Sequence, residues 1–353
     1  MNVTENSLSS TVNEYDYSAF SVYYVKKSDT ISSIFKPALF CILFTCGLVG
    51  NSLVLWVLIY FKKMNSLTDL YLLNMAISDL MFIVSLPFVV YQLLNEWVFG
   101  DFMCKILAAM FFIGFFSGIF LITVLSVDRY LAIVHVVSSL KFRTRKLGLF
   151  ITFVVWTFSF LLSATNFIFV RAETNKGFTD CTAVYPGNPT LWTLLSYFQV
   201  NIFGLVIPLL ILVFCYSQII STLHRSKSMQ KRYAVKLILI LVLVFFVFWA
   251  PYNIVVFLRI LNLLGKFDDP EYDEKLKTAM EVSQTISFLH CCLNPIIYTF
   301  AGDNFKKHLF CMFNKLLKYM NINRRCGSFE KGSVDRSSIT GPNTRSVSSD
   351  AIL

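Results

Sequence analysis

One stretch in the middle of the chain decides its fold: Ser126-Val127-Asp128-Arg129-Tyr130-Leu131-Ala132-Ile133-Val134-His135. Here a long apolar run meets an adjacent acid and base, because residues 106–127 contain no Asp, Glu, Lys or Arg. At about 1.5 Å per residue, a helix of this length crosses a bilayer core of about 30 Å. The sequence therefore predicts a membrane span that ends near Asp128 and Arg129, with the Arg129 side chain reaching toward water.

Six further apolar runs of spanning length accompany this one. Hydrophobic residues make up 56% and charged residues 15% of the 353 residues, and the mean hydropathy is +0.63. Such a composition is typical of a polytopic membrane protein. The apolar runs place the spans at residues 36–61, 69–94, 104–135, 148–170, 192–222, 234–264 and 276–301. The expected fold is an all-α bundle of seven transmembrane helices.

The distribution of charge indicates the orientation of the bundle. With the N-terminus outside and the C-terminus in the cytoplasm, 21 of the 31 Lys and Arg lie on the cytoplasmic side. An excess of Lys and Arg in short cytoplasmic loops is the usual orientation signal. In a soluble chain, the net charge of +10 would suggest nucleic-acid binding. Here it describes a basic cytoplasmic face, so no nucleic-acid partner is expected.

The cysteines agree with this orientation. Of nine cysteines, only Cys104 and Cys181 fall in outer, oxidising segments, which favours one disulfide between them. That bridge would tie the loop 171–191 to the third span. The adjacent residues His290-Cys291-Cys292 suggest a metal site, but small polarizable residues inside a bundle are more often packing residues. We therefore expect no metal and no cofactor.

The segments outside the bundle have distinct compositions. Residues 1–35 form an acidic, tyrosine-rich arm with a glycosylation sequon at Asn2 and an acidic centre at Glu14, Tyr15, Asp16 and Tyr17. Such an arm suits capture of a basic protein, although an inert disordered tail remains the alternative. Residues 302–320 predict an amphipathic helix on the inner leaflet. Residues 321–353 predict a disordered, phosphorylatable tail rich in Ser and Thr.

Two kinds of residue stand out inside the spans. Asp79 lies in the middle of an apolar span, where a carboxylate costs a few kcal/mol unless it faces the interior and is paired, so it is a functional candidate. Prolines interrupt the backbone ladder in spans five, six and seven, and each lies near an aromatic residue. These prolines predict hinges, although ordinary kinks remain the alternative for each. The pairs are Pro208 with Tyr216, Pro251 with Trp249, and Pro295 with Tyr298.

A family resemblance rests on motifs that run through the whole bundle: Asn51, Asp79, Cys104, Asp128-Arg129-Tyr130, Trp156, Pro208, Trp249-Ala250-Pro251 and Asn294-Pro295-Ile296-Ile297-Tyr298. In this order they resemble the rhodopsin-like (class A) G-protein-coupled receptors. The stretches 97–100, 128–135 and 290–295 look like those of the CC chemokine receptors. Residues 62–80 and 348–353 are most similar to the type 8 branch of that family, of which virus-encoded copies are known.

The resemblance implies a receptor in the plasma membrane that binds a basic CC chemokine outside the cell. The resemblance further implies that it signals through a heterotrimeric G protein of the Gi class, supporting chemotaxis and calcium mobilisation, and that arrestin and receptor kinases regulate it at its tail. Besides the arm residues, the implied ligand contacts are Tyr91, Phe111, Phe112, Trp249, Tyr252 and Gln284. The implied activation residues are Asp128, Arg129, Tyr130, Tyr216, Trp249, Pro251, Asn294, Pro295 and Tyr298, and the implied buried polar site is Asn51, Asp79 and Asn294.

Three departures from the family pattern concern the outer side. Residues 1–35 and 265–275 contain no cysteine, so the family's second outer disulfide is missing. Gln284 occupies a position where most chemokine receptors have a Glu, and Val89 stands where many have a Trp. These departures bear on the choice of ligand more than on the family.

The alternative function is a scavenger that binds and internalises chemokine without signalling. The intact Asp128-Arg129-Tyr130 triplet favours signalling, because related decoy receptors often alter it. An enzyme, channel or transporter is not favoured, since the sequence shows neither a nucleotide motif nor an inverted repeat. An opsin is excluded, because the seventh span has no lysine beyond Lys277 to form a Schiff base.

Overall fold

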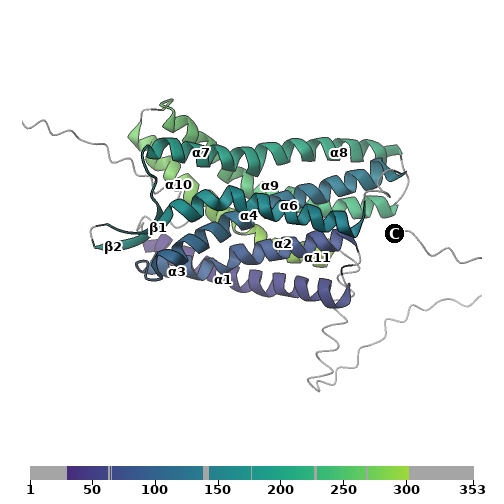
Figure 1. Cartoon of the computed structure of the whole chain (residues 1–353), viewed down its shortest axis with the longest axis horizontal. Coiled ribbons are helices and arrows are strands. Elements are labelled where there is room, and N and C mark those ends of the chain that lie inside the picture. The colour runs from purple at the N-terminus through teal and green to yellow at the C-terminus, as the bar shows by residue number, and fades with distance from the viewer. Residues whose placement is uncertain are drawn as a thin grey trace, which may run out of the picture. The chain divides into compact units, whose positions relative to one another are not determined.

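The computed structural model describes residues 30–62, 64, 66–137, 143–175, 177–225, 229–267 and 269–301. All of them belong to one compact unit, which is almost wholly helical (Figure 1). The predicted arm centre at Glu14, Tyr15, Asp16 and Tyr17, the sequon at Asn2, the helix 302–320 and the tail 321–353 lie outside the described residues.

The described elements form seven passes that run side by side in Figure 1. The first three are α1 (Thr30–Trp56) with the π-helical η2 (Val57–Phe61), then α2 (Leu67–Val84) with α3 (Leu86–Leu94), then α4 (Gly100–Val134). The fourth is α6 (Arg145–Phe169). The fifth joins α7 (Pro189–Asn201), the π-helical η3 (Ile202–Val206) and α8 (Ile207–Arg225). The last two are α9 (Met229–Leu263), then α10 (Pro270–Ser287) with α11 (His290–Ala301). The predicted seven-helix bundle is confirmed.

Six passes are long and apolar enough to cross a membrane by themselves, whereas the seventh is not among them. The sequence predicted one span over 276–301, but the structure divides this pass at Phe288 and Leu289. The backbone there tightens, with Leu289 N–H donating to the Ile286 carbonyl and Cys292 N–H to that of Leu289. The first part of the pass, α10, also carries many charged residues. The helix α10 is therefore polar, and it is followed by the short apolar helix α11.

The helix α4 forms the centre of the bundle. In its span 78% of the residues are buried, against 28% in α6, and it contacts α2, α6, α8 and α9. Its glycines permit a close approach to α2: a Cβ on Gly114 would lie 3.0 Å from the Ser78 carbonyl oxygen, and one on Gly118 would lie 3.3 Å from Ser78 Oγ. Ser78 Oγ donates to the Gly114 carbonyl at 2.7 Å. The small residues Gly114 and Gly118 thus let α4 pack closely against α2.

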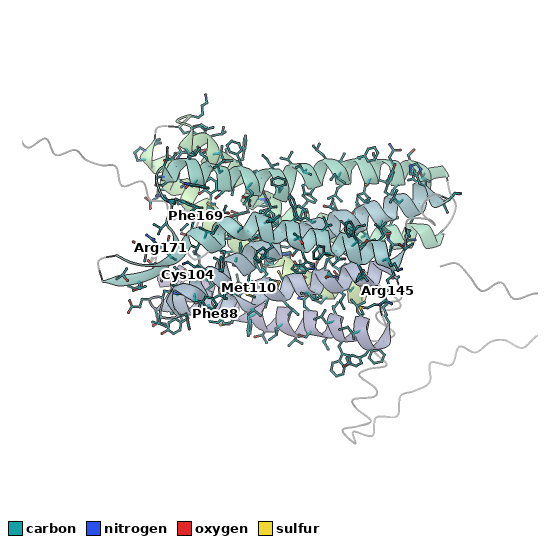
Figure 2. All side chains as sticks on the ribbon, viewed as in Figure 1. Phe88, Cys104, Met110, Arg145, Phe169 and Arg171 are labelled. Carbon is teal, nitrogen blue, oxygen red and sulfur yellow. A yellow bond between two sulfur atoms is a disulfide. The ribbon has the colours of Figure 1, made fainter. Side chains whose placement is uncertain are left out.

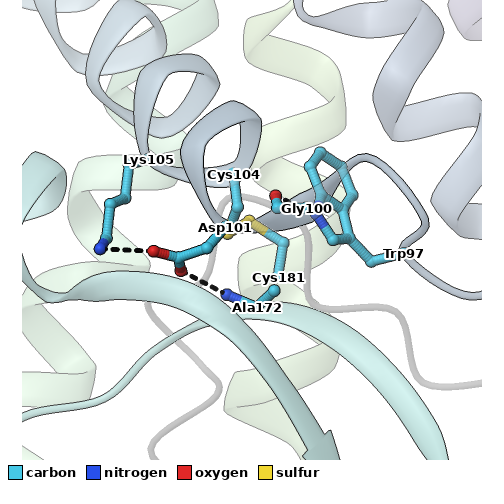
Figure 3. The surroundings of a disulfide bond; sticks show 7 residues. All are labelled: Trp97, Gly100, Asp101, Cys104, Lys105, Ala172 and Cys181. Carbon is cyan, nitrogen blue, oxygen red and sulfur yellow. Dashed lines mark hydrogen bonds and ion pairs between the residues drawn. A yellow bond between two sulfur atoms is a disulfide. The ribbon is translucent and has the colours of Figure 1, made fainter.

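A β-hairpin covers one end of the bundle. The strands β1 (Val170–Asn175) and β2 (Phe178–Ala183) pair antiparallel, and the Cys104–Cys181 disulfide joins β2 to α4 with a Cα–Cα distance of 5.6 Å. Figure 3 shows how Asp101 adds a second link, because its carboxylate accepts from the Ala172 backbone N–H at 3.1 Å and pairs with Lys105. The predicted disulfide is confirmed. We call this end the disulfide end and the opposite one the Arg129 end.

Figure 2 shows the separation of the two ends, with Cys104 and Arg171 toward the left of the bundle and Arg145 at the right. The helix α4 connects them directly, since Cys104 lies in its first turns and Arg129 in its last. The helix α4 thus carries both Cys104, which anchors the hairpin, and the adjacent pair Asp128 and Arg129.

Candidate functional site

Aromatic side chains surround Trp249 in the middle of the bundle. This residue of α9 is 1% exposed, and its ring centroid lies 4.3 Å from that of Phe115 of α4. It also packs edge-on against Tyr252 at 5.8 Å and against His290 of α11 at 5.4 Å. Because the indole packs closely against rings of α4 and α11, we expect a change in its position to be accompanied by movement of those rings.

A polar cluster links α1, α2 and α11 close to this aromatic group. Asn294 Nδ2 donates to Asp79 Oδ2 at 2.8 Å, and Asn51 Nδ2 donates to the Cys291 carbonyl at 3.0 Å. All four residues are buried. The three residues of the expected polar site, Asn51, Asp79 and Asn294, are therefore brought to one place by three separate helices. Such pairing offsets the cost of placing a carboxyl group inside an apolar bundle.

At the Arg129 end, two arginines share the carboxylate of Asp128. Arg143, between α4 and α6, makes two contacts: Nε lies 2.9 Å from Asp128 Oδ1 and Nη2 lies 3.2 Å from Oδ2. Arg129 Nη2 lies 3.7 Å from the same Oδ2 and is the weaker partner. A bidentate arginine–carboxylate contact is stronger and more directional than a single long one. Asp128 is therefore held mainly by Arg143 in this structure.

The tyrosines expected to act in activation have different partners. The Tyr216 hydroxyl lies 3.5 Å from Ser126 Oγ of α4, whereas the Tyr298 hydroxyl points to Met75 Sδ of α2 at 4.0 Å. Tyr130 contacts His135 at 3.0 Å. Both Tyr216 and Tyr298 are buried. The prolines Pro251 and Pro295 lie inside α9 and α11, close in sequence to Trp249 and Tyr298.

Residues 50–298 match the family model described as the 7 transmembrane receptor (rhodopsin family). The chain belongs to this receptor family. Human C-C chemokine receptor type 4 is 42% identical over 91% of this chain and 92% of its own length. Human C-C chemokine receptor type 8 is 40% identical over 92% and 91%, and human CX3C chemokine receptor 1 is 42% identical over 89% and 86%.

Within the rhodopsin family the chain is therefore a chemokine receptor, a multi-pass membrane protein of a receptor family rather than an enzyme family. Identity does not separate the type 8 branch from the others, because the human type 4 and CX3C relatives are as similar. The resemblance to type 8 at residues 62–80 and 348–353 is local, whereas identity is measured over most of the chain.

The side chains expected to contact ligand fall into two groups in this chemokine receptor. Phe111, Phe112, Trp249 and Tyr252 are buried, and Phe111 joins the central aromatic cluster through Phe82 at 4.6 Å. Tyr91 is instead 38% exposed and packs against Phe99 at 5.0 Å, near Phe88 and Trp97 at the disulfide end. Gln284, on α10, is half-buried. The structure thus brings four of the six side chains into the bundle interior and leaves Tyr91 near its surface.

Sequence reasoning missed two ion-pair groups at the disulfide end. Lys36 of α1 binds Glu281 of α10, with Nζ and Oε2 2.6 Å apart. Nearby in the chain, Arg259 of α9 is 4% exposed and binds Asp273 of α10, which also accepts from Asn262 Nδ2 at 2.8 Å. These pairs join α10 to α1 and to α9. The only sequence signal for these ion pairs was a charged residue inside or beside an apolar run. Such a signal does not indicate which residue the charge will bind.

The hairpin adds a titratable group outside the spans. Asp180 is exposed on β2, but partial desolvation raises its pKa above the ordinary value, and a hydrogen bond from Gln92 of α3 opposes that rise. Gln92 is itself buried. The charged form of Asp180 is therefore disfavoured by desolvation, and no cation among the described residues is shown to offset this.

Proposed function

We propose that this chemokine receptor binds a CC chemokine at the disulfide end and activates a heterotrimeric G protein, of the Gi class, at the Arg129 end. One observation carries the proposal: the intact Asp128-Arg129-Tyr130 triplet lies on the same buried helix, α4, as the cysteine that anchors the hairpin. The similarity to chemokine receptors over about nine tenths of the chain supports the ligand class.

The proposed orientation puts the N-terminus and the hairpin outside the cell and the tail in the cytoplasm. The basic residues that follow Asp128 and those between α8 and α9 support it, because such residues are retained on the cytoplasmic side. Disulfide formation supports it independently, since a bridge persists in the oxidising exterior.

Ligand capture would begin at the acidic arm and continue into the bundle. Chemokines are mostly basic, so Glu14, Tyr15, Asp16 and Tyr17 would attract them before contact with Tyr91 and Gln284. Deeper contacts reach the aromatic cluster of Phe111, Phe112, Trp249 and Tyr252 only if the helices move. A ligand that binds one packing of these rings better than the other shifts the receptor toward that packing.

Movement of Trp249 would be passed along α9 and α11 to the Arg129 end. Pro251 and Pro295 lack a backbone donor, and the helix is therefore more easily bent at these residues. Bending of α11 would change the position of Asn294 against Asp79 and of Tyr298 against Met75. In the active state Arg129 leaves Asp128, and Tyr216 and Tyr298 change partners to open the G-protein site.

The finer partners follow from the segments around the bundle. Phosphorylation of the Ser- and Thr-rich tail by receptor kinases would create the negative charge that arrestin binds. Glycosylation at Asn2 fits an arm on the outer side.

The test is a screen of purified CC chemokines on cells that express the receptor, with calcium release and inhibition of cAMP synthesis as readouts. At least one chemokine should produce both responses, and pertussis toxin should abolish them because it uncouples Gi. Chemokine uptake without either response, for every ligand that binds, would contradict signalling and support the scavenger function.

A further inference from the structure

Charge holds the helix α10 to its neighbours. The helix contains no cysteine, so no disulfide ties it to the rest of the bundle. Asp273 in its first turn binds Arg259 of α9, and Glu281 farther along binds Lys36 of α1. Two ion pairs with two different helices therefore contribute to the position of α10.

The two ion pairs differ in how much of the structure depends on them. Arg259 is 4% exposed, and its partner Asp273 also accepts a hydrogen bond from Asn262 Nδ2 at 2.8 Å. Loss of Asp273 would leave a buried guanidinium without its carboxylate, which destabilises a fold strongly. Lys36 and Glu281 are both partly exposed, so water can solvate either one when the other is removed. Their contact is therefore the one that substitution can test.

The Lys36–Glu281 pair is better shielded from solvent than an ordinary surface pair. Its Nζ and Oε2 atoms lie 2.6 Å apart, and the two side chains are only 18% and 19% exposed. Lys275 and Glu271, within α10, pair at 2.7 Å but are 70% and 75% exposed. Water and salt screen an exposed pair, which contributes little to stability. We therefore expect the pair between α1 and α10 to constrain its helices, and the pair within α10 to have little effect.

An aromatic contact joins the same pass to α1 farther along the chain. Phe40, four residues after Lys36, packs against Phe288 with the ring centroids 5.2 Å apart. Phe288 follows α10 directly and also packs edge-on against Phe82 of α2 at 4.9 Å. The seventh pass is therefore joined to α1 at two levels, by an ion pair and by aromatic packing.

Gln284 lies between these two contacts. It comes three residues after Glu281 and four before Phe288, so the three side chains share one face of the pass. The opposite face carries the exposed residues Val282 and Ile286, whereas Gln284 is half-buried. Less than one helical turn separates Glu281 from Gln284. A shift of Glu281 relative to α1 must therefore move Gln284 as well.

We propose that Lys36 and Glu281 are positioning residues for chemokine binding, because their ion pair fixes Gln284 relative to α1. Only the last step of this inference, the contact between Gln284 and chemokine, rests on the proposed function. The position of Gln284 can be measured without chemokine or G protein. Failure of the ion pair to position α10 is thus distinguishable from failure of the proposed function.

The first experiment measures how fast the thiol introduced by Gln284→Cys reacts in the full-length receptor in lipid nanodiscs. The reagent is a short maleimide linked to polyethylene glycol, which is uncharged and therefore insensitive to nearby charge. The receptor without Gln284→Cys, treated in parallel, gives the background from the natural cysteines. Addition of Lys36→Gln should raise the reaction rate at least threefold, because α10 is then free to move away from α1. Glu281→Gln should have the same effect.

Reversal of the pair provides the rescue. Lys36→Glu combined with Glu281→Lys should return the rate to within about twofold of Gln284→Cys alone. Lys275→Gln is the matched control, since it removes the same charge from an exposed pair within α10, and it should leave the rate unchanged. Elution as a single receptor peak in gel filtration establishes that each variant folds. An equal rate with and without Lys36→Gln, or a reversed pair that reacts as fast as Lys36→Gln, would overturn the proposal.

The second experiment measures affinity with native Gln284 in place. The probe is a radiolabelled form of the CC chemokine that gives the strongest calcium response in the screen described above. Lys36→Gln should weaken its binding several-fold, and the reversed pair should restore it. Removal of a positive charge would by itself favour a basic chemokine, so a loss of affinity separates positioning from long-range attraction. Unchanged affinity in Lys36→Gln would overturn the role in chemokine binding.

Discussion

At the scale of single residues, the shared carboxylate of Asp128 has the clearest consequence. Arg143 holds it through two contacts of 2.9 and 3.2 Å, while Arg129 lies at 3.7 Å. Arg143 therefore competes with Arg129 and leaves it only loosely paired. An arginine that is loosely paired is easier to release to a G protein, so Arg143 is expected to raise the receptor's basal activity.

The first prediction follows from this competition. Arg143→Ala should lower basal nucleotide exchange on Gi several-fold, because Asp128 then binds Arg129 alone, and chemokine affinity should stay within about twofold. The control is Arg145→Ala, which removes the same charge from an exposed position. Measurement of GTP analogue binding in membranes distinguishes the two variants. Equal basal activity in both would remove Arg143 from this role.

A second prediction at this scale concerns Asp180. Partial desolvation of this exposed side chain raises its folded-state pKa, so its small contribution to stability is present below the unfolded-state pKa and is lost as the pH rises through the folded-state pKa. Asp180→Asn should therefore raise the melting temperature of the purified receptor slightly at pH 7 and leave it unchanged at acid pH, where the wild-type carboxyl is neutral. A gain of the same size at both pH values would show that the effect is not electrostatic.

At the scale of elements, the hairpin depends on two links to α4, the Cys104–Cys181 bridge and the carboxylate of Asp101. Cross-linking of this kind typically contributes roughly 2–4 kcal/mol to stability. Cys104→Ser or Cys181→Ser should therefore abolish chemokine binding, since the hairpin lies over the end at which we propose that ligand binds. The expected readout is loss of saturable radioligand binding despite surface expression. Free thiols at both positions in the wild-type receptor, found by mass spectrometry, would refute the bridge.

The seventh pass is the element in which the structure differs most clearly from the sequence prediction. The apolar residues of 276–301 predicted one span, and the structure has two helices divided at Phe288 and Leu289. Charge explains the difference in part, because α10 uses Glu281 and Asp273 to bind Lys36 and Arg259 on neighbouring helices. These ion pairs join α10 to α1 and α9. The family's second outer disulfide is missing here, because residues 265–275 contain no cysteine.

At the scale of the whole molecule, the features that could be predicted are those set by a single stretch of sequence. Contacts between residues far apart in the sequence could not be predicted. The absence of charge in residues 106–127 was enough to predict α4, and Cys104 and Cys181 were the only outer cysteines to pair. The contacts of Asp128 with Arg143 and of Asp79 with His290 were not predictable. They join charged groups from different elements, and a one-dimensional pattern reports burial and period but not the partner.

The fourth prediction concerns capture of ligand by the arm. Substitution of Tyr15 and Tyr17 by Phe, or deletion of residues 1–18, should lower the chemokine association rate several-fold and flatten its dependence on salt. The physical reason is that charges on the arm steer the encounter with a basic chemokine, and screening weakens this effect once the Debye length falls to about 10 Å near 0.1 M salt. Surface plasmon resonance at two salt concentrations measures both quantities. An unchanged rate and salt slope after the deletion would show that the bundle alone captures the ligand.

In the proposed function the helix α4 couples chemokine binding at the disulfide end to G-protein activation at the Arg129 end. The most direct test is to measure chemokine binding and Gi activation on the same membranes for the wild type and Arg129→Ala. Arg129→Ala should abolish Gi activation and leave chemokine affinity within a few-fold, because Arg129 lies at the opposite end of α4 from Cys104. Undiminished Gi activation by Arg129→Ala would refute this coupling.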